Sequence, residues 1–325
     1  MSRPSKISIV EVLRGLAVTA VCFAHFAKPV GTAGHFTGMF NSMEFYFKFS
    51  VHVFFVISGF VIPYSMHMSK YTIKDYLRFI AKRFLRLHPP YLIALIFTLI
   101  IAALSYNYRG LPNPETPLSV LKSLFFMHAP TTNPVFWTLK IEAQFYIFIG
   151  LFFAVLQKYP RTALLIAAPI LLFLSQTDAV LYLDMLNWIP FFLIGIVGYL
   201  IYIKTENLSF EYGMMAALIA FSFIFYGFGE ALAGLGTTVL MLYYKGSVNS
   251  VFSFLGEISY SLYLIHFPIG IKFINLVQRY VAPELNWLLF ILAFIISLLC
   301  AWAFWRFIEK PSAKLSKMVK YVRAK

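Results

Sequence analysis

Apolar residues in this chain occur in long, nearly uninterrupted blocks, and no other feature constrains the fold as strongly. Crossing a bilayer core takes roughly 20 mostly apolar residues in a helix. Backbone polar groups there must be satisfied internally, which leaves helices or closed barrels. The blocks do not alternate apolar and polar residues with a period of two, so helices are predicted. We expect an all-α, polytopic transmembrane bundle with about ten spans, near residues 7–29, 44–68, 89–106, 136–156, 162–176, 187–203, 213–228, 230–244, 251–275 and 286–307.

Composition agrees with a membrane protein. Of the 325 residues, 60% are hydrophobic and 12% are charged, whereas soluble domains carry about 25% charged residues. The first block is too long, and too poor in a small-residue cleavage site, for a signal peptide, so we expect a true first span. Both cysteines, Cys22 and Cys300, fall inside apolar blocks. Neither a disulfide framework nor a metal site is therefore expected.

Basic residues predict the orientation of the bundle. With the N-terminus in the cytoplasm, 20 of the 27 lysines and arginines fall on one side of the membrane or at its rim. Such a bias marks the cytoplasmic face, so we expect both termini there. The net charge of +14 then reflects topology and not nucleic-acid binding. The cytoplasmic set is Arg3, Lys6, Arg14, Lys70, Lys74, Arg78, Lys82, Arg83, Arg86, Lys158, Arg161, Lys204, Lys245, Arg306, Lys310, Lys314, Lys317, Lys320, Arg323 and Lys325.

Ionisable side chains within the first span are candidates for function, because charge at membrane depth is costly. Arg14 and His25 lie eleven residues apart, so they share one helix face about 16 Å apart along the axis. The arginine is expected near the cytoplasmic end and the histidine near the outer end. The alternative is structural: Arg14 extends to the interface and His25 is satisfied at the outer surface.

A basic motif follows in the loop expected at residues 69–88. Arg83 and Arg86 are three residues apart and would project together from a helix. Paired guanidiniums suit phosphate groups, since each offers a rigid fork of donors. Ordinary cytoplasmic charge is the alternative interpretation of this motif.

The fourth span begins with Trp137 and places Glu142 and Tyr146 on one helix face. Glu142 lies about 9 Å from the outer end, at a depth similar to that of His25. We therefore expect the two to pair, with a purely structural ion pair as the alternative.

Two further spans carry polar residues at helical spacing. In the ninth, Ser259, Tyr263 and His266 form one stripe, typical of a cavity lining or of hydrogen bonds between helices. In the second, Ser58-Gly59 would permit close helix approach or a local break.

Taken in order, these motifs resemble the acyltransferase 3 family of membrane acyltransferases over essentially the whole chain. The matching pieces run from Arg14 with His25, through Phe54-Phe55-Val-Ile-Ser58-Gly59 and Arg83-x-x-Arg86, to Trp137-Thr-Leu-x-x-Glu142, Ser259-Tyr260-Ser261-Leu-Tyr263 and Glu309-Lys310-Pro311. His52 departs from the pattern, because the resemblance implies an acidic or amide residue there.

The resemblance implies O-acyl transfer from cytoplasmic acyl-CoA, commonly acetyl-CoA, to a hydroxyl of a carbohydrate or lipid-linked glycan, in a bacterial inner membrane. His25 would be the base and Glu142 its orienting carboxylate, while Arg14, Arg83 and Arg86 would hold the CoA phosphates. Trp137, Tyr146, Ser259, Tyr263 and His266 would line the substrate cavity. Whether His25 itself becomes acylated stays open.

We expect two parts of unequal size: a transmembrane acyltransferase domain at residues 1–310, and a basic cytoplasmic tail at residues 311–325 in contact with anionic lipid. Membrane lipids, acyl-CoA and the acceptor are the expected partners. A transporter or exporter of a polar or lipid-linked solute remains the alternative, although the two related halves typical of many transporters are not evident.

Overall fold

The computed structural model describes residues 8–32, 34–204 and 207–321, and this part of the chain contains helices but no strand. The all-α prediction is therefore confirmed. The expected first position of span one, residue 7, and the basic residues Arg3, Lys6, Arg323 and Lys325 lie outside the described residues. The helices are α1 (Ser8–Val30), α2 (Thr37–Phe47), α3 (Ser50–Met68), α4 (Tyr76–Tyr108), α5 (Pro117–Leu124), α6 (Trp137–Leu156), α7 (Pro160–Leu174), α8 (Ile189–Ile203), α9 (Ser209–Phe225), α10 (Phe228–Tyr243), α11 (Ser250–Glu257), α12 (Ser259–His266), α13 (Lys272–Val277), α14 (Asn286–Phe304) and α15 (Lys310–Met318).

Ten of the described helical stretches correspond to the ten predicted spans. Seven are long and apolar enough to cross a membrane: Ser8–Val30, Thr37–Met68, Ile73–Tyr108, Pro134–Leu156, Asp184–Ile203, Ser259–Tyr280 and Pro283–Met318. The shorter apolar helices α7, α9 and α10 match the fifth, seventh and eighth predicted spans. The chain thus forms a polytopic helical bundle.

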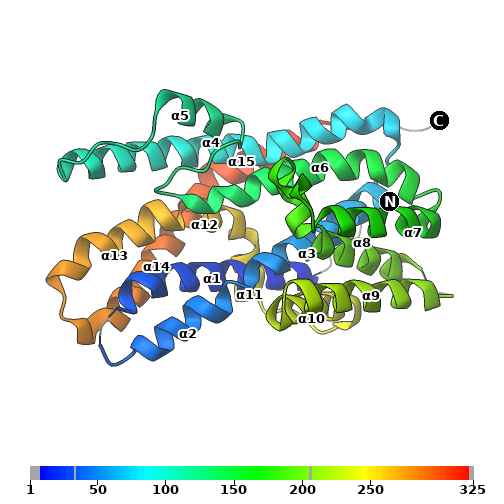
Figure 1. The fold of residues 1–325 in the computed structure, drawn as a ribbon. Coiled ribbons are helices and arrows are strands. Elements are labelled where there is room, and N and C mark those ends of the chain that lie inside the picture. Colours follow the sequence, from blue (N-terminus) through cyan, green and yellow to red (C-terminus); the bar gives the residue numbers. More distant parts are fainter. Residues whose placement is uncertain (1–7, 33, 205–206, 322–325) are drawn as a thin grey trace.

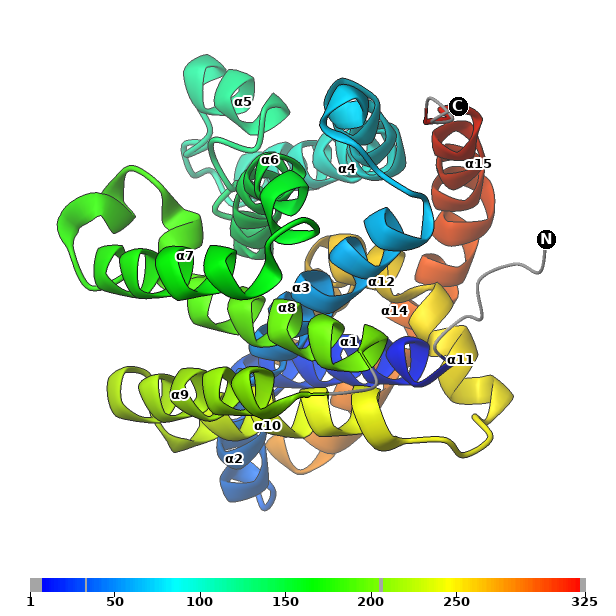
Figure 2. The ribbon, with the colours of Figure 1, turned by 90° about the vertical axis from the view of Figure 1, so that its right-hand side faces the viewer.

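The centre of the bundle is built from α1, α3 and α8, with α4 and α15 along one side and α9 and α10 along the opposite side (Figures 1 and 2). Helix α8 is buried almost throughout. A Cβ atom at Gly59 of α3 would collide with the carbonyl oxygen of Phe192, and one at Gly195 of α8 would collide with that of Val56. Only glycine permits this approach, so Ser58-Gly59 serves close packing and not a helix break.

Helix α4 begins earlier than predicted. The expectation of a loop through residue 88 is wrong, because α4 already begins at Tyr76 and runs through Pro89 and Pro90. These prolines cannot donate to the carbonyls of Leu85 and Arg86. Ser312 Oγ of α15 lies 2.5 Å from the Leu85 oxygen and 3.3 Å from the Arg86 oxygen and donates to them instead. A side chain more than two hundred residues away therefore lets the helix continue.

The same contact shows how the chain continues beyond residue 310. Residues 310–318 of the expected basic tail form α15, whose Ser312 and Ser316 are buried. Positions 322–325 of the expected tail lie outside the described residues. The last membrane helix and α15 are joined by one π-helical stretch, Trp305–Glu309, so the C-terminal helix continues the bundle.

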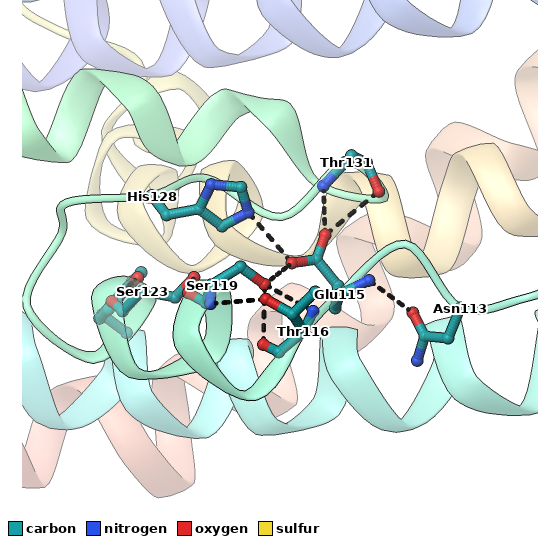
Figure 3. Close-up of polar contacts among 8 residues, drawn as sticks. Asn113, Glu115, Thr116, Ser119, Ser123, His128 and Thr131 are labelled. Carbon is teal, nitrogen blue, oxygen red and sulfur yellow. Dashed lines mark hydrogen bonds and ion pairs between the residues drawn. The ribbon is translucent and has the colours of Figure 1, made fainter.

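The segment between α4 and α6 is organised around Glu115 (Figure 3). Its Oε1 accepts hydrogen bonds from the backbone nitrogen and hydroxyl of Thr131, at 2.9 and 3.2 Å. Its Oε2 accepts from Ser119 Oγ at 2.8 Å and pairs with His128 Nε2 at 3.0 Å. One nearly buried carboxylate thus ties both ends of the segment together.

Candidate functional site

Two cavities lie at different levels along α1. The inner cavity, of about 160 Å³, is lined by Arg14 near the start of the helix. The outer cavity, of about 890 Å³, is lined by His25, about 16 Å further along the axis. Among the residues that the structure describes, Val51 is common to both linings. It lies in the first turn of α3, close to the junction with α2.

Three guanidiniums face the inner cavity. Arg14 comes from α1, and Arg83 and Arg86 come from adjacent turns of α4. Because the basic motif is helical, its two arginines project together, as the spacing predicts. Arg83 also lies 5.4 Å from the ring centre of Phe79 and 5.5 Å from that of Tyr146. These aromatic faces hold the guanidinium in place without neutralising it.

No carboxylate lies within ion-pair distance of these three guanidiniums in the described part of the chain. The two acids that line the same cavity are engaged elsewhere. Glu142 Oε1 accepts a hydrogen bond from the Tyr146 hydroxyl and another from Ser58 Oγ at 3.5 Å. Three cations against two carboxylates, with no direct pairing, leave the cavity with donors free for an anionic ligand.

Glu309 is the second of these acids, and we did not select it as a site residue from the sequence. Its Oε2 accepts hydrogen bonds from the backbone nitrogen of Ser261 at 3.1 Å and from the Ser261 hydroxyl at 2.5 Å. It closes the π-helical stretch Trp305–Glu309, and such stretches often mark functional positions. The available signal was an acidic residue directly after the last apolar block.

The expected pairing of His25 with Glu142 does not form in this structure. His25 lines the outer cavity and Glu142 lines the inner one. Equal depth counted from each helix end does not place the two side chains together, because the first turn of α6 contacts Tyr263 of α12 through Thr138, about one turn before His266. The aromatic rings packed against His25 are those of Phe267, with ring centres 4.8 Å apart, and His266, at 5.5 Å.

The stripe on α12 divides between two environments. Ser259 and Tyr263 line the inner cavity, as expected. The Tyr263 hydroxyl donates to the Val135 oxygen at 2.7 Å and lies 2.7 Å from Thr138 Oγ1. His266 is buried and lines neither of these two cavities.

Aromatic rings form one wall of the outer cavity. Trp137 and Trp188 pack with ring centres 5.1 Å apart. His52, the departure from the family pattern, lies beside Trp188 at 5.1 Å and Phe191 at 4.5 Å, with Nδ1 3.2 Å from the Phe49 oxygen. Charged side chains of both signs complete this cavity, namely Lys28, Glu44, Lys48 and Glu230. It can therefore offer both stacking surfaces and hydrogen bonds to a polar molecule.

The described residues contain no group of three histidine, cysteine or acidic side chains that could hold a metal ion. The two cavities present hydrogen-bonding groups and charged side chains of both signs.

Comparison with known proteins gives one match. The family model described as an acyltransferase domain, Acyl_transf_3, matches residues 7–306, nearly the whole chain. No curated protein and no solved structure matches.

Proposed function

Because the chain belongs to the Acyl_transf_3 family of acyltransferases, we propose that it transfers an acyl group, in the first place acetyl, from cytoplasmic acyl-CoA to a hydroxyl of a carbohydrate or cell-surface glycan. We place it in a bacterial inner membrane. The main support for acyl-CoA as donor is the set of three inner-cavity guanidiniums, which have no carboxylate within ion-pair distance among the described residues. Phosphate groups are the natural ligands of such a cluster.

The size of the inner cavity indicates which part of the donor enters. Pockets that enclose a drug-sized ligand usually measure roughly 300–1,000 Å³, whereas this cavity has about 160 Å³. It suits the thin pantetheine arm better than the nucleotide. Arg86 is exposed, so we place the nucleotide phosphates at the cytoplasmic mouth and the arm along Arg14 towards Val51.

The acceptor occupies the outer cavity in this proposal. His25 removes the proton of the acceptor hydroxyl as its oxygen attacks the thioester carbonyl. A carbon–oxygen bond forms, the carbon–sulfur bond breaks, and the proton held by His25 passes to the departing CoA thiolate. An imidazole suits both transfers, since its reference pKa of about 6.5 lies near neutrality. The Glu142 carboxylate accepts hydrogen bonds from Tyr146 and Ser58 and faces the inner cavity, where the donor binds in this proposal.

Release of free CoA thiol from acetyl-CoA by the purified protein tests this proposal without a known acceptor, because water can take the acceptor's place. We expect His25→Ala to lower the rate by roughly 10²–10⁴-fold, the usual contribution of a general base, while acetyl-CoA binding persists. His35→Ala is the matched control, since His35 is exposed and outside both cavities.

Parental thiol release by a folded His25→Ala protein would remove the histidine from the mechanism. Flux of a polar solute in proteoliposomes, without any thiol release by the parent, would favour a transporter instead.

A further inference from the structure

We propose that His266 is the positioning residue of His25: its Nε2 atom accepts a hydrogen bond from the His25 ring and so presents the other His25 nitrogen to the outer cavity. This inference rests on the proposed role of His25 as base. It fills the place that the sequence assigned to Glu142, whose carboxylate is held by Tyr146 and Ser58 instead.

The proton of His266 is fixed by its own helix. Nδ1 lies 2.8 Å from the Tyr263 oxygen and 3.2 Å from the Leu262 oxygen. Carbonyl oxygens only accept, so Nδ1 carries the hydrogen. In a neutral imidazole the other nitrogen, Nε2, is then an acceptor. This Nε2 is fully buried and has no hydrogen-bond partner among the described residues.

The ring of His25 is the nearest one that can donate to this atom. The two imidazole centres are 5.5 Å apart with planes inclined at 33°, so a rotation of the His25 side chain brings their edges within reach of one hydrogen bond. The other rings around His266, those of Phe26, Tyr263 and Phe267, lie at 5.2–6.1 Å. An acceptor left unpaired in such apolar surroundings is costly, which favours the contact.

A side-chain hydrogen bond stabilises the backbone around His266. Pro268 cannot donate to the carbonyl of Leu264, and Asn133 Nδ2 supplies that hydrogen bond at 3.0 Å. The π-helical stretch Phe267–Ile271 begins directly after His266. Asn133 is itself buried. His266 therefore stands on a rigid, locally widened turn, as the support of a catalytic ring requires.

Accepting a hydrogen bond from one His25 nitrogen has two chemical consequences. It fixes the tautomer, so that the lone pair of the other nitrogen faces the acceptor hydroxyl. It also stabilises the imidazolium formed during attack, as the orienting group does in hydrolase triads. A residue that only fills space would do neither.

Two substitutions at one position separate these roles. His266→Gln keeps an acceptor oxygen near the Nε2 position, whereas His266→Phe keeps the volume and removes the acceptor. We expect kcat for thiol release from acetyl-CoA to fall roughly ten- to a hundredfold in His266→Phe, the effect of one lost buried hydrogen bond. His266→Gln should retain most of the parental rate, and acetyl-CoA affinity should stay unchanged in both.

The pH profile gives a readout that packing alone does not move. Loss of the acceptor destabilises protonated His25, so the acidic limb of the rate profile should shift to lower pH in His266→Phe and stay in place in His266→Gln. The other ionisable groups facing the outer cavity are unchanged in both variants: Lys28, Glu44, Lys48, His52 and Glu230. His88→Phe is the control, a half-buried histidine outside both cavities whose loss should leave the limb unmoved.

Equal rates in both His266 variants, whether parental or equally reduced, would overturn the assignment. If His266→Phe does not fold, judged by size-exclusion profile, His266→Met replaces it in the same comparison. A parent that binds acetyl-CoA but releases no thiol would contradict the proposed function and not this contact alone.

Discussion

Arg83 and Arg86 show what three-residue spacing achieves once the segment is helical. Both guanidiniums reach one cavity, and neither meets a carboxylate within ion-pair distance in the described chain. Guanidiniums that face a cavity without an ion-pair partner can bind an anionic ligand. The proposed donor site rests on this arrangement.

Loss of either guanidinium should weaken the donor complex. We expect Arg83→Ala and Arg86→Ala each to raise the acetyl-CoA dissociation constant by roughly ten- to a hundredfold, as loss of a charge-assisted hydrogen bond implies. Lysine at either position should restore only part of the affinity, because the bidentate fork is gone. Isothermal titration calorimetry on the purified protein measures the effect.

Arg78→Ala serves as the control, since Arg78 lies on the same helix but pairs with Asp75 at 3.5 Å outside the cavity. Unchanged affinity in both cavity variants would reduce the motif to a topology signal.

Spacing along one helix was sufficient to predict which neighbours share a face. Glu142 with Tyr146, and Ser259 with Tyr263, do line one cavity. Contacts between helices were not predictable in this way. The position of Glu142 relative to His25 depends on how far α6 is offset along α1, and a single sequence contains no such information. Glu309 enters the cavity through a π-helical turn that no residue pattern announces.

At the scale of elements, three prolines in two helices depend on distant hydrogen-bond donors. The carbonyls that Pro89, Pro90 and Pro268 leave free are satisfied by Ser312 and Asn133. A proline inside an apolar block is ordinarily read as a helix boundary, whereas α4 continues through Pro89 and Pro90. Only the folded bundle shows the compensating donor.

The junction of α2 and α3 separates donor from acceptor in our account. Backbone hydrogen bonds there are long, at 3.4 Å from Phe49 to Tyr46 and 3.5 Å from Val51 to Lys48. Val51→Phe should lower thiol release by roughly a hundredfold, since misplacing reacting groups by an ångström costs about that much. Acetyl-CoA affinity, measured by calorimetry, should persist.

Val155→Phe is the matched control, on a side chain that is 51% exposed and outside both cavities. Parental thiol release by the Val51→Phe protein would show that the acyl arm takes another route.

The Glu115 cluster predicts an acid-sensitive segment between α4 and α6. Partial burial raises the pKa of Glu115, but hydrogen bonds from Thr131, Ser119 and His128 outweigh it and hold that pKa below the usual value. A carboxyl with a lowered folded-state pKa stabilises the fold above its unfolded pKa of about 4.3. That contribution is lost as pH falls through the folded-state value.

Hydrogen exchange of residues 113–131, corrected for intrinsic rates, should thus stay slow from neutral pH to about 5 and accelerate below about 4. In Glu115→Gln the exchange should be fast already at neutral pH, whereas Glu284→Gln, at an exposed carboxyl, should match the parent. Slow exchange in Glu115→Gln would mean that the carboxylate does not hold the segment.

At the scale of the whole molecule, the ten apolar helical stretches were predictable because apolar block length is a strong and local signal. Most boundaries were close, and the all-α class is confirmed. The first turn of α1 and the last turn of α15 point towards the same end of the bundle (Figure 1). This placement agrees with an even number of crossings.

Cysteine labelling tests the predicted cytoplasmic location of both termini. Asn113→Cys, between α4 and α6, should react with a membrane-impermeant maleimide in intact spheroplasts. Lys158→Cys, between α6 and α7, should react only after permeabilisation, because the positive-inside bias places it in the cytoplasm. Both side chains are exposed. The unsubstituted protein is the control, because it shows any labelling of its own cysteines, Cys22 and Cys300. The reverse labelling pattern would show that the bundle has the opposite orientation, and the proposed donor cavity would then not open to the cytoplasm.

The most direct test of the central claim is calorimetric titration of the purified protein with acetyl-CoA and, in parallel, with S-acetylpantetheine, which lacks the nucleotide and its phosphates. If the three guanidiniums of the inner cavity hold the donor by its phosphates, acetyl-CoA should bind saturably, with an affinity that weakens as salt rises. S-acetylpantetheine should then bind at least tenfold more weakly, with little salt dependence. Equal affinity for the two compounds, or no binding of acetyl-CoA at all, would contradict the account.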